Sequence, residues 1–261
     1  MAREESREEA ARLAAELARS FGARPVDPEE KARLVGEVFA RVAGRYDLMN
    51  DLMSGGVHRL WKDALVDWLV PRSGMRVLDL AGGTGDVAFR ILERTDGRAG
   101  VVLADISPAM LEVGRDRALD RGWLGELVFI AADAEALPFA DRRFDAVTIA
   151  FGIRNVTRID RALAEIRRVL RPGGRFLCLE FSRVVLPWLD RLYERYAFHV
   201  LPRLGRLVLG DAASYRYLAE SIRRFPDQHA FARLIEEAGL ARVRFRNLSG
   251  GIAAIHSAWR L

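Results

Sequence analysis

Residues 77–86 constrain this chain most, because an apolar run there meets an acid and then a cluster of glycines. Residues 75–80 form a β-branched and aliphatic run, which is typical of a strand buried on both faces of a parallel sheet. The sequence from Asp86 onward then fits a helix that packs back on the sheet. Between the two, the backbone can turn sharply and approach a ligand closely at Gly82, Gly83 and Gly85. The pattern therefore predicts a nucleotide-binding turn.

Two further predicted strands also end in an acid. Residues 101–104 are followed by Asp105, at the spacing from the glycine turn at which an acid reaches a ribose in a strand–helix–strand unit. Residues 127–132 are followed by Asp133, which can accept a hydrogen bond from an adenine amino group. Ligands of open α/β sheets lie at the carboxyl ends of the strands. Asp79, Asp105 and Asp133 are therefore predicted to share one site.

The glycine turn by itself admits two cofactors. Residues 83–88 satisfy the loose G-x-G-x-x-A form of the dinucleotide fingerprint. Asp79 favours S-adenosylmethionine instead, because a carboxylate there repels a pyrophosphate and attracts an ammonium or a sulfonium. The competing interpretation is structural, with Asp79 capping the loop or pairing with an arginine.

Helical patterns precede the first strand. Residues 3–20 are rich in Ala, Glu and Arg and carry Leu13, Leu17 and Phe21 on one stripe, so we expect a helix that frays or docks weakly. A second helix is predicted to start at Pro28, after the cap Asp27. A third carries an apolar stripe after the break at residues 54–56. These helices are well placed to form a lid over the substrate.

Five blocks resemble the ubiquinone/menaquinone biosynthesis C-methyltransferase (UbiE-like) family of the class I methyltransferases. They are residues 46–54, 78–86, 151–157, 215–222 and 247–252. The resemblance covers nearly the whole chain and implies an α/β, Rossmann-like fold with a seven-stranded, mostly parallel sheet. It also implies a terminal antiparallel hairpin, which residues 241–247 and 252–259 would form. We expect a helical extension over residues 1–70, a methyltransferase domain over 71–261, and a helical insertion over 183–225 after the fifth strand.

The resemblance implies S-adenosylmethionine as cofactor, S-adenosylhomocysteine as product, and no metal. The cofactor would be held by Asp79, Gly83, Thr84, Gly85, Asp105, Asp133, Ala134 and Ala150. Ala150 departs from the serine that the family commonly has. The missing hydroxyl removes at most one hydrogen bond, worth about 0.5–1.5 kcal/mol, so we expect somewhat weaker cofactor binding with activity retained.

The expected reaction is methyl transfer to a ring carbon of a polyprenyl benzoquinol, a demethylmenaquinol or both, which needs an in-line approach to an electron-rich ring. The resemblance points to Arg154 and Asn155, after the fourth strand, and to Tyr46 in the lid. Because arginine stays protonated, Arg154 would stabilise a phenolate or orient a water, and Asn155 would orient the ring oxygen or that water. Loop bracing is the alternative for both. His58 is a further candidate base, although its apolar stripe favours packing.

Composition narrows the remaining classes. The chain has 261 residues, 50% of them hydrophobic, which fits one α/β domain with additions. Its one cysteine, Cys178, lies in an apolar run and is predicted to be a core residue. The acidic N-terminus is unlike a targeting peptide, and no apolar run reaches the roughly 18 residues of a membrane span. We expect a cytoplasmic protein, with peripheral contact at the inner face of the membrane as a further hypothesis.

The net charge of +5 is concentrated near the C-terminus, where residues 183–261 hold 13 arginines and 7 acidic residues. An apolar stripe there, residues 188–200, is either the buried face of a helix or a basic amphipathic element against a bilayer or a polyprenylated quinol. We expect no nucleic-acid partner, because residues 151–154 lack the Asn/Asp-Pro-Pro-aromatic run of base methylators. A quinone-biosynthesis complex and a homodimer are the other partners considered. Three alternatives stay open: an RNA or protein methyltransferase, an NAD-dependent oxidoreductase, and a nonenzymatic cofactor-binding subunit.

Overall fold

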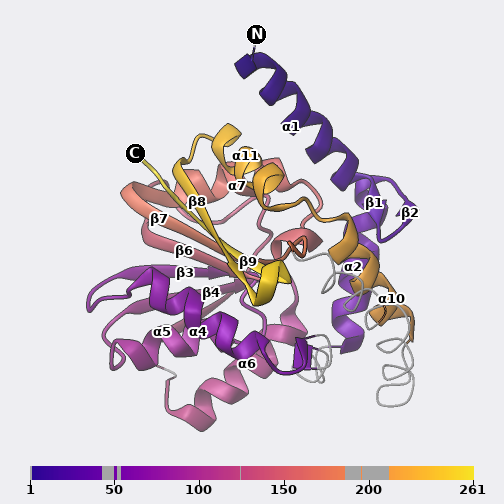
Figure 1. Cartoon of the computed structure of the whole chain (residues 1–261). Coiled ribbons are helices and arrows are strands. Elements are labelled where there is room, and N and C mark those ends of the chain that lie inside the picture. The colour runs from indigo at the N-terminus through magenta and orange to yellow at the C-terminus, as the bar shows by residue number, and fades with distance from the viewer. Residues whose placement is uncertain (1, 43–49, 52–53, 124, 186–194, 196–211) are drawn as a thin grey trace.

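The computed structural model describes residues 2–42, 50–51, 54–123, 125–185, 195 and 212–261 (Figure 1). Tyr46 and most of the predicted insertion, including every apolar residue of the stripe at 188–200, lie outside the described residues. In the part of the chain that is described, helices cover both faces of a central sheet (Figure 1). The division into domains at residue 70 stays a prediction.

The central sheet has seven strands in the order β5-β4-β3-β6-β7-β9-β8. The parallel strands are β3 (Arg76–Leu80), β4 (Gly100–Asp105), β5 (Leu127–Ala131), β6 (Phe144–Ala150) and β7 (Leu170–Phe181). The antiparallel strands β8 (Ala241–Leu248) and β9 (Ala253–Trp259) close one edge. This confirms the predicted mostly parallel sheet with its terminal hairpin. From β3 the strand order runs outward to β4 and β5, and the chain then returns to add β6 on the other side of β3. Open α/β proteins bind their ligands at such a switch in strand order.

Alternating side chains divide the core between the two faces of the sheet. Val77 belongs to one buried cluster and its neighbour Leu78 to the other, as the period of two along a strand requires. The first cluster includes α4 (His58–Leu69), α5 (Asp86–Arg94) and α6 (Pro108–Arg121). The second includes α7 (Ile159–Val169) and α11 (Gln228–Glu237). Cys178 is fully buried in the second cluster, which agrees with the predicted core position.

The N-terminal helix α1 (Ala2–Ala18) packs on α7 and α11, with Ala10, Ala14 and Leu17 buried. The predicted stripe is wrong at Phe21, because the helix has already ended there. Phe21 lies in the short strand β1 (Ser20–Phe21), which pairs with β2 (Arg24–Pro25) across Gly22 at φ +57°. Its ring stacks on Tyr217, with the centroids 4.1 Å apart. A two-residue strand carries no periodicity that a sequence could display.

The first cluster also contains residues of two further helices. The predicted start at Pro28 is confirmed by α2 (Pro28–Val42). The helix α10 (Ala212–Arg224) contacts the 3-10 turn η2 (Ile153–Asn155) that follows β6. The helix α11 begins at Gln228, because the Asp227 carboxylate accepts a hydrogen bond from Ala230 N and caps it.

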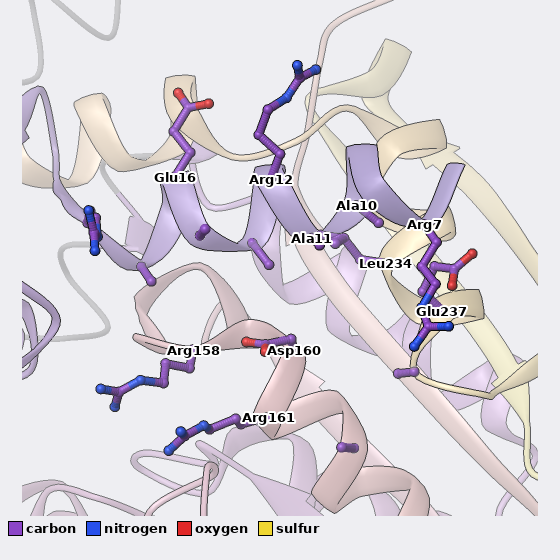
Figure 2. A pocket seen from close by; sticks show the side chains of 16 residues that line it. Arg7, Ala10, Ala11, Arg12, Glu16, Arg158, Asp160, Arg161, Leu234 and Glu237 are labelled. Atoms are coloured by element: carbon purple, nitrogen blue, oxygen red, sulfur yellow. The ribbon is translucent and has the colours of Figure 1, made fainter. Parts of the chain in front are cut away.

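On the face of the sheet that carries the second cluster, a hollow lies between α1, α7 and α11, with alanines of α1 along it (Figure 2). Arg158, the residue before α7, borders it, as do Arg161 of α7 and Leu234 of α11 (Figure 2). None of the predicted site residues in the described part of the chain lines this hollow. The predicted site lies elsewhere, at the glycine turn.

Candidate active site

The strand β3 carries Asp79 into the interior beside the glycine turn. Its side chain is 1% exposed. Asp79 is in register with Thr148 of β6, whose hydroxyl donates to Asp79 Oδ1 at 2.8 Å, while Ala88 N donates to Oδ2 at 3.1 Å. Burial raises the pKa of Asp79 to about 7, and these two hydrogen bonds oppose that rise. Asp79 is therefore a carboxyl group poised to ionise near neutral pH.

The glycine turn is held to the end of β4 by Asp105. Its Oδ2 accepts from Gly83 N at 2.9 Å, and its Oδ1 accepts from Ser107 N at 2.8 Å. Burial raises the pKa of Asp105, against the effect of these hydrogen bonds. Gly85 has φ +88°, and a Cβ on it would lie 2.9 Å from the Phe89 ring. The turn therefore needs glycine both for its backbone angles and for its close packing.

A small cavity lies at this turn, lined by Lys62, Asp79, Ala81, Gly82, Gly83, Thr84, Asp86, Val87 and Ala150. Four of the predicted cofactor residues line it: Asp79, Gly83, Thr84 and Ala150. A Cβ on Gly82 would lie 2.8 Å from Leu103 and 3.0 Å from Asp79, so backbone alone forms that wall. A buried acid beside bare backbone fits a cationic ligand that must come close, as S-adenosylmethionine does.

The remaining predicted cofactor residues lie beside this cavity. Gly85 lets the turn pack against the Phe89 ring, and Asp105 accepts a hydrogen bond from Gly83 N in the turn. Asp133 follows β5 and is exposed, with Oδ1 accepting from Glu135 N at 2.9 Å, and Ala134 is buried. The two are joined to the site through Ala132, whose N donates to the Asp105 carbonyl at 3.0 Å. All of these cofactor assignments stay predictions.

The turn η2 places Arg154 and Asn155 directly after β6, as predicted. Arg154 Nη1 donates to Glu180 Oε1 at 2.6 Å and to the Phe151 carbonyl at 2.8 Å. Both charged side chains are at most 2% exposed. Asn155 Oδ1 accepts from the Tyr217 hydroxyl at 2.9 Å. The two residues are thus brought together, each held by a partner from another element.

Sequence reasoning missed Glu180, although a signal for it exists. Glu180 occupies the position before the end of β7, just as Asp79 does in β3, in an otherwise apolar run. Burial raises the pKa of Glu180, and the charge of Arg154 opposes that rise. An acid in the last two residues of an apolar strand is therefore the pattern that would have found it.

Lys62 and Asp86 form a second charged pair that the sequence did not reveal. Lys62 Nζ lies 2.7 Å from Asp86 Oδ2, and Arg90 Nη1 lies 3.2 Å from Asp86 Oδ1. Although burial opposes it, these two cations hold the pKa of Asp86 well below its usual value. The pair links α4 to the first residue of α5, directly after the glycine turn.

His58, the further candidate base, is 1% exposed and does not line the cavity. Its Nε2 lies 2.9 Å from Asp51 Oδ1. Burial and the charge of Lys62 lower the pKa of His58, against the effect of Asp51. These surroundings agree with the packing interpretation.

Neither a metal site nor a spanning helix is found within the described ranges. No group of three His, Cys, Asp or Glu side chains there is placed to hold a metal ion. Among the helices of those ranges, none has both the length and the apolar character that crossing a membrane requires.

The fold is that of the class I methyltransferases. Its marks are acids at the ends of neighbouring parallel strands, a glycine turn beside the point where the strand order switches, and an antiparallel edge. Solved structures share this fold. A methyltransferase of Thermotoga maritima titled a possible histamine N-methyltransferase has a TM-score of 0.61 at 20% identity, covering 87% of this chain and all of that one. A methyltransferase of Aquifex aeolicus has a TM-score of 0.60 at 15% identity, and the match covers 82% of this chain and 98% of that one.

The chain belongs to the ubiE/COQ5 methyltransferase family, whose family model matches residues 27–260. It is 59% identical over 244 residues to the ubiquinone/menaquinone biosynthesis C-methyltransferase UbiE of Brucella abortus, covering 93% of this chain and 91% of the relative. The protein of the same name from Brucella anthropi is 58% identical, covering 93% of both chains. The resemblance seen in the five sequence blocks is therefore confirmed.

Proposed function

We propose that the protein transfers a methyl group from S-adenosylmethionine to a ring carbon of a polyprenyl benzoquinol, a demethylmenaquinol or both, in ubiquinone and menaquinone biosynthesis. The observation that carries this proposal is the 59% identity to a C-methyltransferase of that pathway along nearly the whole chain. The cavity at the glycine turn supports the cofactor, because a buried acid would face a cationic ligand there.

When bound, the cofactor supplies an electrophilic methyl group on a sulfonium. Asp79 would attract its positive charge from the cavity wall, and Gly83 and Thr84 would approach it through the turn. Asp105 would bind the ribose, and Asp133 with Ala134 the adenine. Ala150 would leave room for the cofactor without contributing a hydroxyl.

On the acceptor side, Arg154 would donate a hydrogen bond to the ring oxygen as its proton leaves, or orient the water that receives the proton. The ion pair with Glu180 fixes the guanidinium in one orientation. Asn155, held by Tyr217, would orient the ring oxygen. Tyr46 would approach from the lid. An oxygen held as a phenolate would enrich the ring carbon that attacks the methyl group, and that carbon would then lose its own proton to water, which restores the aromatic ring.

Where the protein acts follows from the acceptor. A polyprenylated quinol resides in a bilayer, so we propose a cytoplasmic protein that touches the inner face of the membrane through the basic residues of 183–261. A homodimer and a quinone-biosynthesis complex are further proposals. Sedimentation with anionic vesicles would test the membrane contact. Protein that stays in the supernatant in the presence of the vesicles would contradict it.

Quinone profiling tests the function directly. In cells lacking the protein, mass spectrometry should find an accumulated intermediate that is lighter than its methylated product by one methylene group. The intermediate that accumulates identifies the benzoquinol or naphthoquinol substrate. Complementation with Arg154→Lys, which keeps the buried charge, should restore little product, whereas an exposed change such as Arg59→Lys should restore it fully. An unaltered quinone pool would contradict the proposed function.

A further inference from the structure

Lys62 is an unusual residue in this chain. All but two of the 41 basic residues are arginines, the exceptions being Lys31 and Lys62. Lys62 lies on α4, is only 4% exposed and lines the cavity at the glycine turn. A chain that uses arginine almost everywhere thus places at this cavity a lysine, whose charge is a compact point rather than a planar guanidinium.

The ammonium of Lys62 has donors to spare. Within the part of the chain that the structure describes, Nζ makes one hydrogen bond, to Asp86 Oδ2 at 2.7 Å. An ammonium carries three protons, and a buried charged group normally satisfies its hydrogen bonds. The Asp86 carboxylate is itself shared with Arg90, which contacts its other oxygen. Lys62 can therefore accommodate a second anionic partner on the cavity side.

The cofactor proposed above carries a matching group. Its methionine end is a zwitterion, with an ammonium and a carboxylate on one carbon. The cavity wall presents the opposite pair, a buried carboxyl at Asp79 and a buried ammonium at Lys62. We propose that Lys62 binds the methionine carboxylate of S-adenosylmethionine, while Asp79 faces its cationic groups. This inference rests on the proposed use of that cofactor.

The other lysine provides a matched control. Lys31 is also buried, at 3% exposed, but its Nζ donates to the Leu17 and Val156 carbonyls at 2.8 and 3.1 Å. It does not line the cavity. Lys31→Met therefore removes the same buried charge without removing a group from the cofactor site.

Calorimetry with two ligands tests the proposal. S-adenosylhomocysteine carries the carboxylate, and its decarboxylated analogue lacks only that group. Lys62→Met should weaken binding of S-adenosylhomocysteine roughly 10- to 100-fold, the range for a lost hydrogen bond to a charged group. Binding of the decarboxylated analogue should change less than about threefold, because the lost contact is absent in both proteins. Lys31→Met should leave the ratio of the two affinities unchanged.

Several results would overturn the assignment. If Lys62→Met weakens both ligands equally, Lys62 only supports Asp86. If Lys62→Met does not fold, Lys62→Gln replaces it in the same measurement. The wild-type protein gives a second test, because it must bind S-adenosylhomocysteine more tightly than the decarboxylated analogue by a similar factor. Equal affinities in the wild type contradict the carboxylate contact. A wild type that binds neither ligand rejects the proposed cofactor itself, a failure distinct from that of Lys62.

Discussion

Glu180 Oε1 accepts a hydrogen bond from Arg154 Nη1 at 2.6 Å in the interior of the protein. Removing one partner of a buried pair leaves the other charge without compensation. Glu180→Gln should therefore lower the free energy of unfolding by about 3–5 kcal/mol, measured by urea denaturation. As a control, Glu93→Gln disrupts the exposed pair with Arg121 and should cost about 0–1 kcal/mol. Equal effects of the two changes would contradict the role of burial.

The stability of the protein should depend on pH through Asp79. Burial raises its pKa from 3.8 to about 7, so the folded chain holds this proton more tightly than the unfolded chain does. The free energy of unfolding contributed by Asp79 therefore falls as the pH rises from about 4 to about 7. Asp79→Asn should remove that slope, which amounts to at most about 1.4 kcal/mol per pH unit.

Denaturation series at several pH values would measure this slope. Thr148→Val is the companion variant, because it removes a hydrogen bond to the ionised carboxylate and should extend the fall to higher pH. Identical pH profiles for the wild type and Asp79→Asn would show that the carboxyl group does not titrate in this interval.

Tyr217→Phe should separate turnover from cofactor binding. The change removes the hydrogen bond to Asn155 Oδ1 but keeps the ring that stacks on Phe21. We expect kcat to fall about 2- to 10-fold, which corresponds to one hydrogen bond. Affinity for S-adenosylhomocysteine should not change, because Tyr217 does not line the cavity. Phe21→Leu, which keeps the hydroxyl, should lower stability with a smaller effect on kcat. A larger loss of kcat in Phe21→Leu than in Tyr217→Phe would indicate that stacking, not the hydrogen bond, positions Asn155.

Two glycine substitutions should distinguish backbone strain from close packing. Gly85 and Gly122 have φ +88° and +73°, but only at Gly85 would an added Cβ meet atoms within 4 Å, in the Phe89 ring and Leu103. Gly122→Ala should cost about 1–2 kcal/mol of stability from strain alone. Gly85→Ala should cost more and should also weaken cofactor binding. Thermal melts and calorimetry would measure both, and equal costs would contradict the packing role of Gly85.

The glycine turn, which we propose to hold the cofactor, could be predicted from the sequence because its pieces are local. An acid, three glycines and a helix start follow one another within residues 79–86, and the periodicity of the strands indicated the sheet. The proposed acceptor half depends on partners that the fold brings together. Arg154 meets Glu180 26 residues later, and Asn155 meets Tyr217 62 residues later. No spacing rule predicts such pairs. The position of Glu180 near the end of an apolar strand marks the acid but not its partner, and nothing in the sequence pattern indicated the stack of Phe21 on Tyr217.

Lys31 joins the residues that the family model matches to a residue that precedes them. It lies inside the family-matched residues 27–260, yet one of its two acceptors, the Leu17 carbonyl, lies before them. The other acceptor, Val156, follows Asn155 directly. A shortened protein starting at residue 27 would leave this buried ammonium with half of its partners, one residue from the proposed acceptor site. The first residue that the family model matches is therefore a poor place to cut this protein for expression or crystallisation.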